Sequence, residues 1–433
     1  MRSADSKPWR ATKIKFTART VAGGTPESGN PDYWDGSVPW LTPVDLGNEG
    51  NDAITTSKRK LTEAGVRAAG LERLPSGSIV ISTRAPIGSV GLLACEAVTN
   101  QGCKALVPDT RALDSHYGFY LAVDFAEKLQ SLGLGTTFIE LSTYSLKNLA
   151  VRLPIPAQQR SIAANLDEAI RKVDRLGTLR RRQMELLREQ RAALIQQAVT
   201  RGVNPNAPLK DSGLKWVGQI PEHWETKRLK YLCSLLRDGT HQPPKRVEIG
   251  YPLLSVRNIV RGTFTIREDD SMISEADFNV LNQSFVVRTS DLLVAIVGAT
   301  LGKVAVVPDM RPFQIQRSLA ILRPRPETVN RCFLRYLIEC QSFQQCMWSN
   351  VGFSAQPGIY LSTVGDLACP LPPLVEQQRI LEFIETESQR IDSLLSAYAR
   401  QLELLTEYRA ALIHECVTGQ RTVSEPVSLG EPA

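Results

Sequence analysis

The sequence has few of the residues and patterns that build metal sites or membrane spans. It holds eight cysteines and four histidines in 433 residues, and no two cysteines form a CxxC pair. The histidines do not stand beside the cysteines at zinc-ligand spacing, so we predict no metal site. No run of 18 apolar residues occurs, and the first residues lack the apolar core of a signal peptide. These absences predict a cytoplasmic protein whose cysteines stay reduced.

The composition is that of a globular protein with more than one domain. Hydrophobic residues make up 42% of the chain and charged residues 22%, both ordinary values for a folded protein. One hydrophobic core seldom serves 433 residues, so two or more domains are expected. The net charge of +6 is compatible with a nucleic-acid partner but does not require one.

A long internal repeat organises the chain. The stretch "LLREQRAALIQQAVTRG" (186–202) returns as "LLTEYRAALIHECVTGQ" (404–420), with ten of 17 positions identical. Upstream, "LPIPAQQRSI" (153–162) returns as "LPPLVEQQRIL" (371–381) in the same order. The period of 218 residues is far too long for a solenoid. The repeat therefore predicts two copies of a whole domain, each followed by a helix.

The two domain copies have diverged more than the two helices. The stretch "GGTPESG" (23–29) aligns with "DGTHQPP" (238–244), and "VPWLTPVDL" (38–46) aligns with "YPLLSVRNI" (251–259). Short apolar runs rich in β-branched residues alternate with glycine and proline, which is typical of mixed α/β or mostly-β domains. Divergent domains on similar helices suggest two different targets read by one common frame.

Each helical segment carries a heptad pattern. Alternating steps of four and three residues separate its apolar positions, which indicates a coiled-coil seam. Residues 158–191 have a net charge of +4 and residues 376–409 a net charge of −3, which favours pairing of one helix with the other. Two core helices of an ordinary bundle are the alternative. The predicted helix-pairing residues are Val173, Leu176, Leu187, Leu194, Ile391, Leu394, Tyr398, Leu405 and Leu412.

Several stretches resemble one protein family. "DSGLKWVGQIPEHWETKRLKYL" (211–232) is similar to the segment that opens a target-recognition domain in specificity subunits of type I restriction–modification enzymes. The "GTP" after the first tryptophan, "STRAPIG" (82–88), "LPPLVEQQRIL" and "RAALIHECVTGQ" also resemble stretches of that family, in the family's order. The resemblance covers roughly residues 9–420, although the first copy lacks the full "DSG…IPEHW" lead-in.

The resemblance implies an α+β fold with two mixed α/β target-recognition domains. The internal repeat itself predicts that two long antiparallel coiled-coil helices join these domains with pseudo-two-fold symmetry. The expected divisions are target-recognition domain 1 (1–152), helical spacer 1 (153–204), target-recognition domain 2 (205–370), helical spacer 2 (371–420) and a disordered tail (421–433).

The resemblance also implies a function. Each recognition domain would read one half of an asymmetric bipartite site in double-stranded DNA. The helices would set the spacing and dock two methyltransferase subunits. The chain itself would catalyse nothing and bind no cofactor. S-adenosylmethionine would belong to the methyltransferase, and ATP and magnesium to a separate restriction subunit.

Motifs for catalysis in the chain itself fail. Neither an NPPY- or DPPY-type tetrapeptide for adenine methylation nor an FxGxG cofactor loop occurs. "GATLGKV" (298–304) has three residues between its glycines where a phosphate loop needs four, and Val304 stands where Ser or Thr should bind magnesium. A strand–turn–strand is the better interpretation. A coiled-coil scaffold that binds protein and a self-sufficient DNA-modifying enzyme are the alternative functions.

DNA contacts are predicted on exposed loops. Phosphates should be bound by Lys and Arg, and bases by Arg, Asn, Gln, Ser or Thr. For each candidate the alternative is a solvated surface side chain. A basic run at 175–183 is expected to face the acidic helix, a methyltransferase subunit or the DNA backbone. The candidates are Thr25, Lys58, Arg59, Lys60, Arg84 and Lys104 in the first domain, and Lys245, Arg246, Arg257, Asn258, Arg261 and Arg317 in the second.

Overall fold

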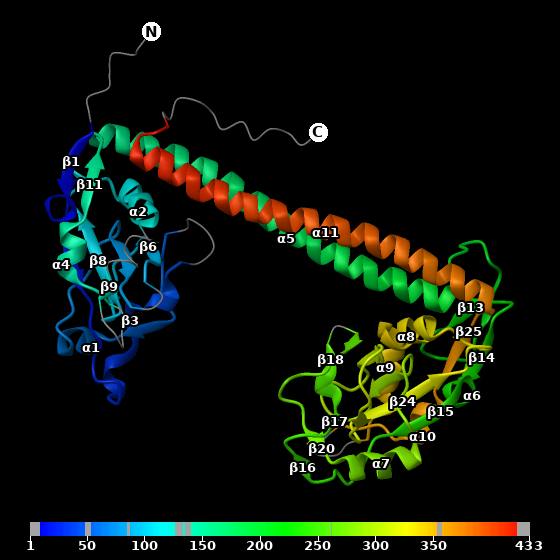
Figure 1. Cartoon of the computed structure of the whole chain (residues 1–433). Helices are drawn as coiled ribbons and strands as arrows, with labels where there is room; N and C mark the ends of the chain where they lie inside the picture. Colours follow the sequence, from blue (N-terminus) through cyan, green and yellow to red (C-terminus); the bar gives the residue numbers. More distant parts are fainter. Residues whose placement is uncertain are drawn as a thin grey trace. The chain divides into compact units, whose positions relative to one another are not determined.

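The chain forms two compact α+β units, as a computed structural model shows (Figure 1). Unit 1 comprises residues 1–182 and 398–433, and unit 2 comprises residues 183–397, so each unit contains one of the two predicted recognition domains and parts of both long helices. No helix among the described residues is long and apolar enough to cross a membrane. The predicted tail after Arg421 lies outside the described residues. The structure describes residues 9–47, 53–84, 87–125, 133–134, 140–260, 262–352 and 357–421.

Four sheets build the recognition domain of unit 1, one of them the two-stranded sheet of β9 Gly133–Leu134 and β10 Glu140–Leu141. The central sheet has the order β2-β8-β5-β6 with antiparallel neighbours. In the second sheet, β3 pairs antiparallel with β4 and parallel with β7. Strands β1 and β11 join the beginning of the domain to its end. The elements are β1 Arg10–Lys13, β2 Ala18–Ala22, β3 Trp34–Leu41, β4 Arg59–Leu61, α1 Glu63–Ala68, β5 Ile79–Ser82, β6 Val90–Leu92, β7 Val98–Thr99, β8 Cys103–Pro108, α2 Ser115–Asp124, α4 Thr143–Asn148 and β11 Ala150–Leu153.

Unit 2 repeats this plan with additions. Its central sheet has the order β15-β24-β21-β22-β19-β18, and its second sheet the order β16-β20-β17-β23. Strands β14 and β25 pair as β1 and β11 do. The elements are β14 Glu225–Arg228, α6 Leu229–Leu232, β15 Cys233–Asp238, β16 Arg246–Val247, β17 Tyr251–Leu254, β18 Ile259–Val260, β19 Thr263–Phe264, β20 Met272–Ile273, α7 Glu275–Ser284, β21 Leu292–Ala295, β22 Val304–Val306, β23 Gln314–Ile315, β24 Leu319–Pro324, α8 Arg331–Glu339, α9 Gln341–Ser349, α10 Leu361–Asp366 and β25 Ala368–Leu371.

The turn between β21 and β22 confirms the strand–turn–strand prediction for "GATLGKV". The two strands pair antiparallel, and the hairpin corresponds to β5 and β6 of unit 1. Gly302 and Gly88 occupy these two turns with φ angles of 91° and 96°, a region that L side chains avoid. The segment is therefore a glycine-dependent hairpin and not a phosphate loop.

Two long helices complete the units: α5 (Pro156–Arg201) and α11 (Leu374–Thr418). They run antiparallel within each unit, and the same pair of positions forms an ion pair in both. Arg409 Nε lies 3.4 Å from Asp174 Oδ1 in unit 1, and Arg191 Nη1 lies 2.8 Å from Asp392 Oδ1 in unit 2. The two pairs are related by the 218-residue repeat. Both are partly exposed, so each adds little stability and serves mainly to fix the pairing register.

The seam between the helices differs in phase from the predicted heptad. Leu394, predicted at the seam, is 38% exposed, whereas the next residue, Leu395, is half-buried. In the first copy Gly177 is buried beside the predicted Leu176, which is half-buried. The predicted and observed seams share positions such as Val173 and Ile391. From each shared position the observed seam advances by four residues and then by three, whereas the predicted seam advances by three and then by four. The other predicted residues fit this phase: Val173, Ile391 and Leu412 are buried, and Leu187, Leu194, Tyr398 and Leu405 are half-buried.

A buried glutamine from each "QQR" stretch fastens each helix to a recognition domain. Gln159 is fully buried; its Nε2 donates to the carbonyls of Ala112 and Pro154 at 2.9 Å, and its Oε1 accepts from the backbone N–H of Asp114 at 2.7 Å. Because Asp114 caps α2, the glutamine holds the start of that helix.

Gln377 does the same in unit 2. Its Nε2 donates to the carbonyls of Thr328 and Pro372, and its Oε1 accepts from the N–H of Asn330, the N-cap of α8. Gln159 and Gln377 are themselves fully buried, where an unpaired polar group would cost about 1–3 kcal/mol. The repeated "QQR" is therefore a buried clamp.

Each helix ends on a glycine that packs against a tryptophan. Gly202 and Gly419 have φ angles of 76° and 77°, as expected for the residue that terminates a helix. A Cβ on Gly202 would lie 3.2 Å from Trp224 Cζ2, and a Cβ on Gly419 would lie 2.9 Å from Trp9 Cζ2. Both tryptophans stand at the start of a recognition domain, so each domain is docked on the end of one helix and the beginning of the other.

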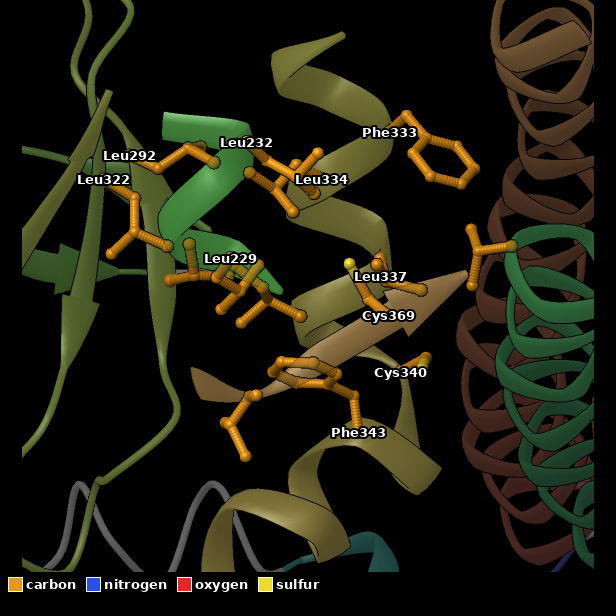
Figure 2. Close-up of a cluster of buried hydrophobic side chains, with 14 of the residues drawn as sticks. Leu229, Leu232, Leu292, Leu322, Phe333, Leu334, Leu337, Cys340, Phe343 and Cys369 are labelled. Atoms are coloured by element: carbon orange, nitrogen blue, oxygen red, sulfur yellow. The ribbon is translucent and has the colours of Figure 1, made fainter. Parts of the chain in front are cut away.

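Apolar side chains from the helices enter the core of each unit. In unit 2, Ala198 and Val199 of α5 and Ile380 and Ile384 of α11 join the main cluster with α6, α8 and the central sheet. Figure 2 shows ten labelled members of this cluster, among them Phe333 and Leu337 of α8 and Leu292 and Leu322 of the sheet. In unit 1, Ile170 and Leu412 occur in the equivalent cluster. Helix and domain therefore share one core in each unit.

Burial predicts which cysteines react. Cys103, Cys233, Cys340, Cys369 and Cys416 are buried free thiols, and Cys95, Cys332 and Cys346 are half-buried. Desolvation raises the pKa of Cys103 and of Cys233 to about 12, so the folded protein holds them as thiols at pH 8.

We expect three thiols to react with a disulfide reagent at pH 8 before unfolding, and five only after it. Because these folded pKa values are raised, stability should fall as the pH rises above the ordinary thiol value of about 8.5. Reaction of all eight thiols at one rate in native protein would contradict this burial.

Candidate nucleic-acid interface

A tight corner forms at one end of the central sheet in unit 1, where β2 leaves the sheet and β8 enters it. The backbone N–H of Gly23 donates to Cys103 O at 3.4 Å, and that of Gly24 donates to Thr99 O at 2.9 Å. A Cβ on Gly23 would lie 2.1 Å from Asn100 O, so only glycine fits there. At the exposed end of the corner, the Thr25 hydroxyl donates to Gln101 Oε1.

Two tryptophans fix the backbone of this corner through hydrogen bonds. The indole N–H of Trp40 donates to Gly24 O at 3.0 Å, and that of Trp34 donates to Glu27 O at 3.3 Å. Their rings meet edge to face with centroids 5.1 Å apart. The Arg59 guanidinium lies 3.7 Å over the Trp34 ring, a cation–π contact. The loop that follows Gly23 is therefore anchored and presents its tip in a fixed position.

Unit 2 has the same corner on the same backbone. Gly239 N–H donates to Leu319 O and Thr240 N–H donates to Ile315 O, both at 3.0 Å. A Cβ on Gly239 would lie 2.2 Å from Ile315 O. The N–H of Arg317 returns a bond to Thr240 O at 3.1 Å. The side chain of His241 is held by Asp238, with Nε2 2.7 Å from Oδ2.

These contacts correct the sequence alignment of the two copies by one residue. The sequence pattern places "GGTPESG" against "DGTHQPP" with an offset of 215 residues, matching Thr25 to Thr240. The strand pairs Ala22↔Lys104 and Asp238↔Ala320 show an offset of 216. Thr25 therefore corresponds to His241, and Gln101 to Arg317. The Gly-Thr dipeptide that occurs in both copies suggests the wrong alignment. The close approach of neighbouring backbone requires only one glycine in each copy, Gly23 in unit 1 and Gly239 in unit 2.

The basic stretch "SKRK" of unit 1 is largely exposed, as predicted. Lys58 and Arg59 are exposed and Lys60 is half-buried, with Arg59 and Lys60 on β4 beside the corner's supporting strand β3. Arg84 is exposed as well. Lys104 contradicts the prediction, since it is only 6% exposed and its Nζ donates to Leu141 O at 2.6 Å. It points into the domain and has no access to DNA.

In unit 2, Lys245, Arg246 and Arg317 are exposed as predicted. Asn258 is a correction, because it is fully buried and its side chain bonds to Ser255 N, Thr265 O and Asp270 Oδ2. It caps a turn and, being buried, cannot reach a base.

Arg257 is committed to its own domain. It binds Asp270 and Asp269, whose hydrogen bonds raise the pKa of the guanidinium. Because of these ion pairs, Arg257 is not available to neutralise a phosphate. Arg261 lies outside the described residues.

Equivalent positions in the two domains carry opposite charge. Lys60 pairs with Pro39 on β3, and Met272 pairs with Pro252 on the equivalent β17. The stretch "SKRK" of unit 1 thus corresponds to "DDSM" (269–272) of unit 2, where both aspartates bind Arg257. The same frame therefore carries different chemistry in the two units.

Sequence reasoning missed Gln101 and His241. Each stands at the tip of a corner that a glycine makes possible, and the turn-forming "NQG" and "DGTH" stretches were the available signals. No group of three or more His, Cys, Asp or Glu residues suited to a metal ion occurs in the described part of the chain.

Comparison with known proteins agrees with the duplicated architecture. A family model described as "Type I restriction modification DNA specificity domain" matches twice, over residues 8–182 and 221–403. The MjaIX specificity subunit of Methanocaldococcus jannaschii is 25% identical over 97% of this chain and 95% of its own length. The EcoBI specificity subunit of Escherichia coli is 23% identical over 75% of this chain and 70% of its own.

Solved structures share the fold. A chain from a study of "complex assembly and conformational transition of the type I R-M system" superimposes with a TM-score of 0.70, at 19% identity, over 96% of this chain and 99% of that one. The HsdS subunit of Thermoanaerobacter tengcongensis gives a TM-score of 0.57 at 18% identity, over 97% of this chain and all of that one. With two family domains on a duplicated frame, the chain belongs to the specificity subunits of type I restriction–modification systems.

Proposed function

We propose that each recognition domain reads one half of an asymmetric bipartite site in double-stranded DNA. The observation that carries this proposal is the pair of corners, built on one backbone frame and ending in different side chains: Thr25 and Gln101 in unit 1, His241 and Arg317 in unit 2. A common frame suits one kind of ligand, and different tips suit different base sequences. Exposed cations near the corners, such as Lys58 and Lys245, would bind phosphates.

The same frame supports a division of labour between the chain and its partners. The long helices would set the distance between the half-sites. They would also dock two methyltransferase subunits, which bring S-adenosylmethionine. A restriction subunit would bring ATP and magnesium. The chain itself would contribute recognition and no catalysis.

A duplicated stripe on the solvent face of the helices supports docking of one partner twice. Packing does not explain identity at exposed positions, but contact with two copies of one protein does. Five residues of α5 recur in α11 218 positions later, at spacings that place them on one helix face. Their leucines, Leu186 and Leu404, are each 46% exposed. The duplicated stripe consists of Glu185, Leu186, Glu189, Ala192 and Ala193 of α5, and of Glu403, Leu404, Glu407, Ala410 and Ala411 of α11.

Mapping methylated adenines tests the DNA-reading part. The chain is purified with its methyltransferase partner, the complex acts on unmethylated genomic DNA, and the modified positions are sequenced. We expect one asymmetric motif with two specified halves and an unspecified spacer. A continuous palindrome would contradict the two-reader arrangement, and methyl transfer by the chain alone would contradict its non-catalytic role.

The docking part predicts a change in stoichiometry. Leu404→Glu puts a carboxylate into one stripe, and burying it unpaired should weaken docking there by at least about 30-fold. Native mass spectrometry should then find one methyltransferase per chain instead of two, and none for Leu186→Glu with Leu404→Glu. The matched control is Leu179→Glu, because Leu179 is 52% exposed but its counterpart is Ala397. Two bound copies on the double variant would refute the stripe.

A further inference from the structure

We propose that the exposed pair at the tip of each corner reads a base edge in the major groove: Gln101 with Thr25 in the first half-site, and Arg317 with His241 in the second. This assignment rests on the proposed bipartite DNA function and names the residues that decide which bases each half contains. It also sorts the predicted candidates into base readers and phosphate binders.

Both corners hold their tip residues in a fixed geometry. In both units the corner is fixed by backbone hydrogen bonds and by a glycine that tolerates no Cβ, so its position does not depend on the tip residues. Thr25, Gln101, His241 and Arg317 are all exposed. A reader has to be held within about 0.5 Å of its productive position by a rigid support, and a corner braced on a sheet supplies this support.

The side chains at the tips carry the donors and acceptors that base edges require. A glutamine amide can bind adenine at N6 and N7 together, and a guanidinium can bind guanine at O6 and N7. The Gln101 carbonyl already accepts the Thr25 hydroxyl, which orients the amide while leaving its N–H₂ group and a second lone pair for a base. Arg317 uses only its backbone N–H within the corner and forms no ion pair with a described residue. The first half-site should therefore contain an adenine read by Gln101, and the second a guanine read by Arg317.

The neighbouring candidates are less suited to base readout. Arg257 is bound to two aspartates, and Asn258 and Lys104 are buried. Arg59 is stacked on Trp34, where it braces the corner. Lys60 and Lys245 are point charges on flexible stems, which suit phosphates better than base edges. Among the predicted polar residues that the structure describes, Arg317 and Thr25 alone combine exposure with a place on the corner.

Reciprocal substitutions test the assignment. Gln101→Arg and Arg317→Gln are purified as complexes with the methyltransferase and offered a pool of DNA duplexes with a randomised core, and bound sequences are counted. In Gln101→Arg, one adenine of the first half should change to guanine, with discrimination of at least about 10-fold, while the second half stays as in the unmodified complex. Arg317→Gln should change one guanine of the second half to adenine and leave the first unchanged.

Charge controls separate base readout from phosphate binding. Lys60→Gln and Lys245→Gln should weaken binding to all sequences about equally and lower the salt dependence by about one phosphate contact. Equal weakening of all sequences by Gln101→Arg and Arg317→Gln would overturn the assignment, as would no change at all. In either case, a bipartite motif for the unmodified complex would show that the proposed function stands; without such a motif, the proposed function itself fails. Thr25→Ala provides a second test of the first corner. Because this substitution frees the Gln101 amide, the preference for adenine should weaken.

Discussion

A complex with one extra heptad in each long helix is expected to select a DNA site whose two halves lie about three base pairs further apart. Seven helical residues add about 10 Å, and one base pair spans about 3.4 Å. The insertions would follow Arg182 in α5 and Ala397 in α11, the positions where both helices pass from one unit to the other. Because the seam repeats every seven residues, the helix contacts of each unit should survive.

The expected measurement is the methylated motif of the altered complex. Methylation at the original spacing should fall by at least about 100-fold, because three base pairs also rotate one half-site by roughly 100° relative to the other. Both half-sequences should stay unchanged. The control is insertion into α5 alone, which displaces the seam and should cost activity at every spacing. Altered half-sequences in the double insertion would mean that the helices read DNA, and the ruler interpretation would be wrong.

Removal of either buried glutamine clamp is expected to destabilise one unit and spare the other. Gln159→Ala leaves the N–H of Asp114 and the carbonyls of Ala112 and Pro154 without partners inside the core of unit 1. At about 1 kcal/mol or more for each lost bond, the free energy of unfolding of this unit should fall by about 3 kcal/mol. For a unit of about 200 residues, its melting temperature should fall by about 6–12 °C.

Calorimetry can assign the effect, because Gln377→Ala should lower the transition of unit 2 by a similar amount. The exposed neighbours Gln158 and Gln378 provide the controls. Their alanine variants remove the same side chain from the same helix turn and should change stability by less than about 0.5 kcal/mol. A loss from Gln159→Ala no greater than that from Gln158→Ala would show that the clamp contributes nothing.

The sequence predicted the long helices well and their contact face less well. The 218-residue repeat and the prolines at the helix starts located α5 and α11, which begin at Pro156 and directly after Pro373. The seam phase was wrong at alternate positions, because Leu176 looks more like a seam residue than Gly177 does. A glycine gives no hydrophobic signal, yet it lets the partner helix approach. Hydrophobic periodicity therefore locates a helix more reliably than it identifies the face of the helix that contacts a neighbouring helix.

The exposure of the candidate interface residues could be predicted only in part from the sequence. Exposure of Lys58, Arg59, Lys245 and Arg317 followed from their loop and edge positions. The burial of Lys104 did not, because its strand is interior and its amine donates to Leu141 O inside the domain. For Asn258 a signal was present: "SVRN" aligns with "TPVD", and in both stretches the fourth residue caps a turn begun by Ser or Thr. That pattern marks a structural asparagine.

The docking of each recognition domain on the start of one helix and the end of the other constrains how the chain can be made. Unit 2 is a continuous segment of the chain, but unit 1 needs residues from both ends, as in the bond from the Tyr117 hydroxyl to Val417 O. At about 5–20 residues per second, roughly 10–40 seconds separate synthesis of residue 182 from that of residue 398. During this interval the nascent first domain keeps an uncovered apolar face. A ribosome that stops short of the last helical turns therefore releases a complete second domain attached to a first domain that is open to chaperones and proteases.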